Sequence, residues 1–479
     1  MTDVHLNLID GTWVPGDHLT ENRNPSDLSD LIGRYAAATA ADVDRAARAA
    51  AAALPAWQAK GPLARAELLD RIARRVDAEA EVIGRMLARE EGKILPEAIA
   101  EVRRAAQIFR FYGGEALRIA GEALASVRPG VDVTITREPL GVVGLITPWN
   151  FPAAIPAWKV APALAYGNAV ILKPAELVPG TAHHLARIIH EEGCPPGIFN
   201  LVMGPGSVVG RAMVDHPLIA GLSFTGSVPT GRAIALAGAA TMKKLQLEMG
   251  GKNPMVVLDD ADLDLAVAAC LNGAFFSTGQ RCTASSRLIV QAGVHDAFVA
   301  RLTEAMLALR VGPALAEDSQ IGPVVSAMQL RGNLDYVDLA RAEGCTVIGG
   351  EALNGPTEGY FQRPALFLGA QNDMRVAREE IFGPCAAVIK VADFDEALSV
   401  ANDTPFGLSA GICTASLKHA RAFRQGARVG MVMVNLPTAG VDFHVPFGGT
   451  KGSSLGPREQ GRHAAEFFTT MKTAYSFGG

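Results

Sequence analysis

Apolar and polar positions follow a helical pattern in the first part of the chain. Residues 41–58 are rich in alanine, and residues 63–75 repeat apolar side chains at helical spacing with Arg and Asp between them. Such spacing places the apolar side chains on one face of a helix. A further helix is predicted from residue 101 onward, and it should end near Gly113 and Gly114, because glycine favours a helix stop.

Short apolar segments alternate with helical ones in the middle of the chain. Residues 131–137 alternate apolar and polar side chains, which is typical of a half-exposed strand. The buried strands predicted after it cover residues 142–146, 169–172 and 221–224, and the helices between them cover residues 181–192 and 208–216. Since strand and helix alternate at this spacing, the pattern predicts an α/β fold with a parallel sheet.

A second alternation of strands and helices begins near residue 253. Its predicted strands cover residues 253–258, 287–290, 386–389 and 430–434, and its predicted helices cover residues 263–275 and 294–308. Residues 466–475 are predicted to form a terminal strand. Together with the strand at 131–137, this tail would make a small exposed unit whose unpaired edges can pair with another subunit.

Composition fits a globular protein of two or three domains. The chain has 479 residues, 49% of them hydrophobic, and its net charge of −5 is spread along the sequence. Neither a nucleic-acid surface nor a polybasic membrane surface is indicated. The most apolar long stretch, residues 141–172, contains four prolines and Lys159, which suits a buried core segment and not a membrane helix.

The six cysteines are widely spaced, and no two of them form a CxxC pair. This spacing favours a reduced, cytoplasmic setting over a disulfide framework. Residues 1–5 show no charged segment followed by an apolar one, so no signal peptide is expected. The ten histidines show no ligand spacing, and no metal site is predicted.

One thiol and one carboxylate, each beside glycine, are candidates for catalysis. Cys282 closes the segment 279–282, and Glu248 opens the segment 248–251. A thiolate attacks carbonyl carbon well, and a nearby carboxylate can then activate water. Taken alone, either segment could equally be an ordinary turn.

Two glycine-containing loops are candidates for binding a nucleotide. Residues 204–210, which include Gly206, miss the glycine spacing of a Rossmann loop by one position and would also suit a plain turn. In the second loop a strand is predicted to end in Gly226 and Ser227, and Gly231 to open a helix. Free N–H groups at such a helix start favour phosphate, although a tight turn is the alternative.

Lys173 and Glu176 follow the predicted strand at 169–172. The carboxyl ends of parallel strands are where α/β folds bind ligands. Lys173 could hold ribose hydroxyls or a phosphate, and Glu176 could accept a hydrogen bond from a 2′-hydroxyl. A solvated pair of loop residues is the alternative interpretation.

Seven short motifs follow one another along residues 148–449. They are Pro148-Trp149-Asn150-Phe151-Pro152, Lys173-Pro174-Ala175-Glu176, Phe224-Thr225-Gly226-Ser227, Glu248-Met249-Gly250-Gly251-Lys252, Gly279-Gln280-Arg281-Cys282, Glu379-Glu380-Ile381-Phe382-Gly383-Pro384 and Pro446-Phe447-Gly448-Gly449. In order and spacing, these motifs closely resemble the aldehyde dehydrogenase superfamily. The chain length and both flanks also fit, so the resemblance covers essentially the whole chain.

The resemblance implies an α/β subunit in three parts that assembles as a homodimer or homotetramer. A variant Rossmann domain for NAD(P) would comprise residues 1–122 and 140–248. A catalytic α/β domain would comprise residues 249–445. A small β oligomerisation and bridging unit would comprise residues 123–139 and 446–479.

The resemblance also implies a role for each matching residue. Cys282 would be the nucleophile, Glu248 the general base, and Asn150 the side-chain donor to an oxyanion, beside the Cys282 backbone N–H. The implied cofactor-binding residues are Ile146, Thr147, Trp149, Lys173, Glu176, Gly206, Gly226, Ser227, Gly231, Glu380 and Phe382. In the implied reaction the thiolate adds to an aldehyde, a hydride leaves for the nicotinamide, and water activated by Glu248 hydrolyses the thioester.

Arg281 directly precedes Cys282, and its guanidinium could grip a substrate carboxylate. The alternative is that it bonds neighbouring carbonyl groups. Apolar residues would form a tunnel to the thiol; they are Phe151, Trp158, Phe276 and Phe447. Trp158 argues against a simple succinic semialdehyde dehydrogenase, where the family pattern usually places arginine.

Segments 157–168, 281–287, 451–461 and 465–470 resemble the α-ketoglutarate semialdehyde (2,5-dioxopentanoate) dehydrogenase branch of bacterial sugar-acid catabolism. That substrate carries a carboxylate, which would give Arg281 a partner. Glu176 should repel a 2′-phosphate and so favours NAD, although the branch often also accepts NADP.

Other interpretations are an enzyme for succinic semialdehyde or for aromatic or aliphatic aldehydes, a coenzyme-A-acylating enzyme, and an inactive binding or structural protein. Glu248 within its full motif argues against the acylating enzyme, because that enzyme needs no hydrolytic base. The presence of all the implied catalytic groups argues against the inactive protein.

Overall fold

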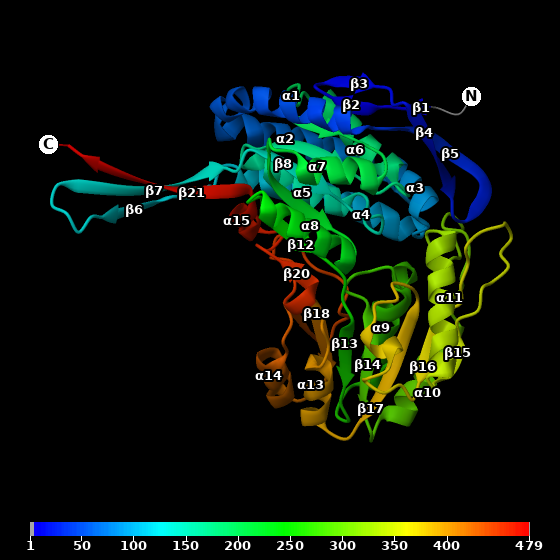
Figure 1. Ribbon diagram of the computed structural model, residues 1–479. Coiled ribbons are helices and arrows are strands. Elements are labelled where there is room, and N and C mark those ends of the chain that lie inside the picture. The colour runs from blue at the N-terminus through cyan, green and yellow to red at the C-terminus, as the bar shows by residue number, and fades with distance from the viewer. Residues whose placement is uncertain (1–3, 479) are drawn as a thin grey trace.

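The computed structural model describes residues 4–478, and the strands of these residues form two large sheets and two small ones (Figure 1). The two large sheets build two bodies, one from the N-terminal half and one from most of the C-terminal half. A narrow arm made of β6 (Glu122–Ala125), β7 (Val131–Pro139) and β21 (Thr469–Phe477) extends from the first body (Figure 1). Residues 1–3, on which part of the signal-peptide expectation rests, lie outside the described residues.

The first body contains an eight-stranded sheet in the order β20-β12-β11-β8-β9-β10-β2-β3. The strands from β12 to β10 are parallel, and β20, β2 and β3 are added antiparallel at the edges. This confirms the predicted parallel α/β sheet. The strands are β2 (Asn7–Ile9), β3 (Thr12–Val14), β8 (Val142–Ile146), β9 (Ala169–Lys173), β10 (Phe199–Leu201), β11 (Ile219–Thr225), β12 (Lys244–Glu248) and β20 (Ser454–Leu455).

The register of the parallel strands gathers several motifs at one edge of this sheet. Ile146 lies opposite Lys173, and Thr225 lies opposite Glu248, each at or near the carboxyl end of its strand. Ligands of open α/β sheets bind at this edge. The fold therefore places segments distant in sequence at a common site.

Helices cover the eight-stranded sheet, as the amphipathic pattern predicts. They are α1 (Ala40–Ala59), α2 (Gly61–Ala78), α3 (Ala80–Glu91), α4 (Leu95–Glu115), α5 (Ala154–Ala165), α6 (Pro179–Glu191), a π-helical turn (Gly206–Gly210), α7 (Arg211–Asp215) and α8 (Val228–Ala240). Every residue of α5 is buried, so the apolar, proline-rich stretch is a core segment. Among residues 4–478 no helix is both long and apolar enough to cross a membrane.

Helix α8 begins earlier than the sequence suggested. Strand β11 ends at Thr225, and the helix starts at Val228, so Gly231 lies inside it and does not open it. The Ser227 side chain accepts a hydrogen bond from the Thr230 backbone N–H at 3.4 Å and thereby caps the helix. A serine cap followed by a proline in the first turn favours this earlier start.

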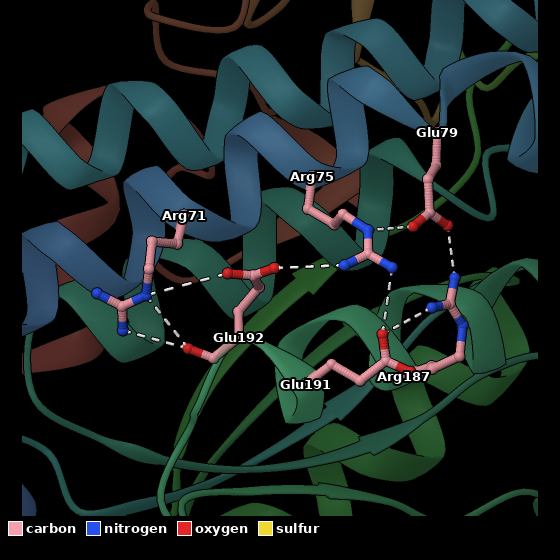
Figure 2. Close-up of polar contacts among 6 residues, drawn as sticks. All are labelled: Arg71, Arg75, Glu79, Arg187, Glu191 and Glu192. Atoms are coloured by element: carbon pink, nitrogen blue, oxygen red, sulfur yellow. Dashed lines mark hydrogen bonds and ion pairs between the residues drawn. The ribbon is translucent and has the colours of Figure 1, made fainter.

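Charged side chains link α2 to the end of α6 (Figure 2). Three arginines and three glutamates alternate, and Arg187 donates to Glu79 at 2.5 Å and to Glu191 at 2.8 Å. The members are Arg71, Arg75, Glu79, Arg187, Glu191 and Glu192. Since these side chains are 19–42% exposed, water screens the pairs, and the network fixes the helix ends more than it adds stability.

The second body contains a seven-stranded sheet in the order β15-β16-β17-β14-β13-β18-β19, parallel except for β15. Its strands are β13 (Asn253–Val257), β14 (Ser285–Gln291), β15 (Thr346–Gly349), β16 (Ala365–Leu368), β17 (Cys385–Val391), β18 (Ser409–Cys413) and β19 (Met431–Val434). Its helices are α9 (Leu263–Phe275), the short 3-10 turn Phe276–Gly279, α10 (His295–Leu307), α11 (Ala327–Ala342), α12 (Arg375–Arg378), α13 (Phe394–Asn402) and α14 (Leu417–Gly426).

The small sheets are β1 (Val4–His5), β5 (Asp27–Ala37) and β4 (His18–Asn24), and the arm of β21 (Thr469–Phe477), β7 (Val131–Pro139) and β6 (Glu122–Ala125). The predicted pairing of residues 131–137 with the tail is confirmed, since β21 pairs antiparallel with β7 from Thr469↔Pro139 to Phe477↔Val131.

The prediction that the terminal strand begins at residue 466 is wrong. Short 3-10 turns cover Lys451–Ser453 and Arg462–Ala464, and residues Ala465–Phe468 form the helical turn α15. Phe467 and Phe468 are 0% and 1% exposed and pack into the core of the first body. Burial of two adjacent aromatic side chains on one side suits a helical turn and not a strand, whose successive side chains point to opposite faces.

Candidate active site

Cys282 lies in the wall that two cavities share. One cavity, of about 380 Å³, is lined by residues of α4 and α5, and the other, of about 270 Å³, is lined by residues that follow β8 and β11. Both cavities lie where the two bodies meet, because their walls combine segments of each. A thiol at this position can face one ligand on each side.

The loop that carries Cys282 has an unusual backbone. Helix α9 ends at Phe275, and Ser277, Thr278 and Gly279 then adopt positive φ angles of 51°, 58° and 64°. Such angles cost free energy for non-glycine residues and persist only where contacts hold them. Thr278 Oγ1 donates to the Gly322 carbonyl at 3.1 Å, and Gln280 Oε1 accepts from the Val325 N–H at 3.0 Å. These contacts hold the reversal that delivers Cys282 to the cavities.

Among the described residues, Cys282 is the one cysteine that is only partly buried, while the other five are buried. Burial of the sulfur, with Glu380 and Glu248 nearby, raises the pKa of the Cys282 thiol to about 12, although the backbone N–H groups of Cys282 and Thr283 partly oppose this. In the absence of a cationic ligand the thiol is therefore protonated and weakly nucleophilic at neutral pH.

Alkylation of the enzyme by iodoacetamide without nucleotide should report this raised pKa. The labelling rate should rise about tenfold per pH unit between about pH 7 and pH 10, because the thiolate fraction increases tenfold per unit below the pKa. Peptide mass spectrometry would follow the label at Cys282, with Cys282→Ser as the unlabelled control. A rate that levels off below about pH 9 would contradict the raised pKa.

Asn150 lies in the wall of the smaller cavity together with Cys282. It is 3% exposed, and its Nδ2 donates to the backbone carbonyl of Gln280 at 2.9 Å. One amide hydrogen is thus used to fix the side chain against the cysteine loop. The second hydrogen remains available for another acceptor.

Glu248 is 2% exposed and accepts a hydrogen bond from Ser454 Oγ at 2.6 Å. Its side chain is not part of the described lining of either cavity. Burial, and then the neighbouring Glu459, raise the pKa of the Glu248 carboxyl well above its usual range. A Cβ atom at Gly448 would lie 2.6 Å from Glu248 Oε1, so glycine at 448 leaves room beside the carboxylate.

Behind Glu248 lies a buried polar network that the sequence reasoning missed. Lys159, 0% exposed, donates to Ser223 Oγ at 2.6 Å and to Glu459 Oε1. Ser223 in turn donates to Gln246 Oε1 at 2.8 Å. A lysine inside the most apolar stretch of the chain was the available signal, because a buried ammonium requires a buried carboxylate partner.

The smaller cavity brings together several of the residues predicted to bind the cofactor. Its lining includes Trp149, Gly226, Ser227, Glu380 and Phe382. The rings of Trp149 and Phe382 meet edge to face at 5.3 Å. Glu380 Oε1 accepts from the Gly251 N–H at 3.0 Å, and burial raises the pKa of its carboxyl to about 7.

A third cavity, of about 440 Å³, lies on the other side of the α8 N-terminus. Ile146, Gly206, Thr230 and Ile234 are among its lining residues. Lys173 is 5% exposed at the end of β9. Glu176 Oε1 accepts from the Gly206 N–H at 2.9 Å, so this carboxylate holds the turn before α7.

A dinucleotide fits this arrangement. One cavity at the N-terminus of α8 is almost entirely apolar, and the other combines polar groups with an aromatic pair. A pyrophosphate between two nucleosides would therefore meet the free N–H groups of α8. The buried hydroxyls of Thr147 and Thr225 have no partner within the described residues. A Cβ atom at Gly231 would overlap the Met249 side chain, so glycine at 231 allows close packing there.

The larger cavity contains most of the predicted substrate residues. Phe151, Trp158, Arg281 and Phe447 line it with Cys282. Phe276 is not in its described lining; it is partly buried and packs against the core around α9 and β14. Arg281 does not bond neighbouring carbonyl groups, as the alternative interpretation expected, because its guanidinium bonds the side chains of Glu97 at 3.1 Å and Ser277 at 2.9 Å.

Residues 4–478 contain no cluster of three His, Cys, Asp or Glu side chains that could hold a metal ion. The reactive groups that the site does contain are a thiol, buried carboxylates and amide donors.

Comparison with known proteins supports the same interpretation. The model of the "Aldehyde dehydrogenase family" matches residues 13–474. The chain is 44% identical to the alpha-ketoglutaric semialdehyde dehydrogenase of Bacillus subtilis, over 99% of this chain and 98% of that protein. It is 39% identical to the 2,5-dioxopentanoate dehydrogenase of Saccharolobus solfataricus, over 94% and 95% respectively. Its fold matches a betaine aldehyde dehydrogenase from Staphylococcus aureus, solved in complex with NAD⁺, with a TM-score of 0.97, 32% identity and coverage of 99% and 95%.

Proposed function

Because this chain belongs to the aldehyde dehydrogenase family, we propose that it oxidises 2,5-dioxopentanoate to 2-oxoglutarate. It is an NAD(P)-dependent aldehyde dehydrogenase. The observation that carries the proposal is the position of Cys282 in the wall between two cavities, one with the features of a nicotinamide site and one with charged and aromatic walls.

In the proposed mechanism, Cys282 is the nucleophile. Its thiolate adds to the aldehyde carbon and forms a tetrahedral thiohemiacetal, whose oxyanion accepts from Asn150 Nδ2 and from the Cys282 backbone N–H. Each such donor is typically worth about 3–4 kcal/mol of transition-state stabilisation. NAD(P)⁺, when bound, supplies the hydride acceptor and a positive charge that favours the thiolate. The residues that would hold this cofactor are Ile146, Thr147, Trp149, Lys173, Glu176, Gly206, Gly226, Ser227, Glu380 and Phe382.

Glu248 is the proposed base for hydrolysis of the thioester. Its carboxylate is bonded to Ser454 and must turn toward Cys282 to accept a proton from water. The glycine at 448 gives it room to move. Burial raises the pKa of the Glu248 carboxyl, so its carboxylate form is a stronger base toward water than an exposed glutamate.

The charges of the larger cavity support an anionic aldehyde. Lys93, Arg104 and Arg281 line it, against the carboxylates Glu97 and Glu101. Such a wall is unfavourable for a cationic aldehyde such as betaine aldehyde. Succinic semialdehyde shares the terminal carboxylate and is the alternative substrate.

Steady-state kinetics test the proposed substrate. We expect the highest kcat/KM for 2,5-dioxopentanoate among a panel that includes succinic semialdehyde, betaine aldehyde, benzaldehyde and pentanal, each measured with NAD⁺ and with NADP⁺. NAD⁺ should be preferred, because Glu176 would repel a 2′-phosphate. A higher kcat/KM for betaine aldehyde or benzaldehyde would overturn the substrate assignment.

We also propose a role for each of three parts of the chain and a homo-oligomeric assembly. Residues 1–122 and 140–248 would bind the cofactor, residues 249–445 would carry the nucleophile, and residues 123–139 and 446–479 would form the bridging unit. The arm exposes Leu124, Tyr475 and Phe477, and both of its edges are unpaired among residues 4–478, so it suits pairing with another copy in a homodimer or homotetramer. Six free cysteines suit a cytoplasmic location.

A further inference from the structure

Three cations line the cavity that contains Cys282, and two of them are neutralised within the chain. Lys93 Nζ bonds Glu101 and the Asn150 carbonyl at 2.8 Å, and it lies 3.8 Å from the centre of the Phe151 ring. The Arg281 guanidinium bonds Glu97, Ser277 and, at 3.4 Å, Asn272. Both carboxylates of this cavity wall are thereby used.

Arg104 is the third cation, and its charge has no such partner. No carboxylate of the described residues lies within 4.0 Å of its guanidinium, and Glu101 and Asp442 act on it only at longer range. Its one hydrogen bond among these residues is long, 3.5 Å from Nη2 to Gln460 Oε1. Its Nε is buried without an acceptor. An arginine held in this way is available to an anion that enters from outside.

Two further donors of the same wall lack an acceptor. Trp158 Nε1 and Gln460 Nε2 are buried and have no hydrogen-bond partner among residues 4–478. A buried donor without a partner is energetically unfavourable. A ligand group with oxygen acceptors would form the missing hydrogen bonds and so bind more tightly than an apolar group of the same size. The carboxylate and 2-oxo oxygens of an α-keto acid are such acceptors.

Arg104 also lies at the entrance of the larger cavity, the one lined by α4 and α5. It lines both the inner cavity with Cys282 and an outer groove along α4 formed by Leu95, Pro96, Ile99, Ala100, Arg103 and Gln107. An aldehyde whose reactive carbon meets Cys282 would have its far end toward this entrance. A terminal carboxylate is therefore expected at Arg104.

We infer that Arg104, and not Arg281, binds the carboxylate of the substrate and sets the preference for anionic aldehydes. Arg281 instead positions the cysteine loop through Glu97 and Ser277. This inference rests on the proposed function, since it concerns the far end of the substrate that Cys282 attacks.

The test compares Arg104→Met with Arg110→Met on 2,5-dioxopentanoate and on pentanal, which has five carbons and no carboxylate. Arg104→Met should lower kcat/KM for 2,5-dioxopentanoate about 10- to 100-fold, mainly through KM, because it removes a charge-assisted hydrogen-bonding partner. With pentanal, kcat/KM should change less than about threefold, because this substrate has no carboxylate to lose a contact. Arg110 is exposed on the same helix and lines neither the cavity nor the groove, so Arg110→Met should leave kcat/KM unchanged for both substrates.

Equal losses on both aldehydes, or no loss on either, would overturn the inference. If Arg104→Met does not fold, Arg104→Lys keeps the charge and most of the side-chain stem but not the planar fork, and it should still lose activity on 2,5-dioxopentanoate alone. Wild-type turnover separates the two claims. If the wild type oxidises 2,5-dioxopentanoate but the Arg104 variants keep its ratio of kcat/KM between 2,5-dioxopentanoate and pentanal, the proposed function stands and this inference is wrong. A wild type without aldehyde oxidation defeats the proposed function itself.

Discussion

Replacing Cys282 with alanine should reduce aldehyde-dependent NADH formation by about 10⁴-fold or more, because loss of a covalent nucleophile removes the whole acylation pathway. The residue is partly exposed in a cavity wall, so the smaller side chain should leave the fold intact. NAD⁺ binding, measured by isothermal titration calorimetry, should persist. Turnover with 2,5-dioxopentanoate would be measured by the absorbance of NADH.

Cys194 provides the matched control. It is buried in the core of the first body, 8% exposed, and lines neither of the cavities that contain Cys282. Cys194→Ala should therefore keep near wild-type turnover with a modest loss of thermal stability. Activity that survived in Cys282→Ala, or that was lost equally in both variants, would remove Cys282 from the role of nucleophile.

Replacing Glu248 with glutamine should separate the two halves of the reaction. Acylation and hydride transfer should proceed once, giving a burst of about one NADH per active site, and steady-state turnover should then fall about 10²- to 10⁴-fold for want of a base. Stopped-flow absorbance would resolve the burst from the slow phase. Glutamine can still accept a hydrogen bond from Ser454, so the packing around residue 248 should be preserved.

The exposed Glu304 on α10 is a suitable control, and Glu304→Gln should behave as the wild type. Loss of the burst itself in Glu248→Gln would mean that this carboxylate acts before the thioester forms. Unchanged steady-state turnover would show that another group activates water.

Local pattern predicted the elements of this fold because most of them bury one face or both. The buried strands β8 and β9 follow the apolar runs at 142–146 and 169–172, and α9 begins and ends at the predicted residues. The pattern failed at residues 465–468, where two adjacent aromatic side chains fill a core contributed by other segments. Tertiary packing outweighs local strand preference at these residues, and a short window of sequence contains no information about that packing.

Contacts within the site were harder to predict than its members. Motifs placed Cys282, Asn150 and Trp149 near each other, but the state of each charged group depends on partners far along the chain. Arg281 meets Glu97 across 184 positions, and Ser454 meets Glu248 across 206. The sequence showed an arginine beside the nucleophile, and only the fold showed that its charge is already paired and that Arg104 is not.

Intact-protein mass spectrometry of Glu248→Gln tests the central claim most directly. The variant would be mixed with 2,5-dioxopentanoate and NAD⁺ and quenched in acid after the NADH burst. We predict one added 2-oxoglutaryl group per chain, released by hydroxylamine and located by peptide mapping at Cys282. An unmodified chain after a full burst, or an acyl group on any residue other than Cys282, would contradict the account.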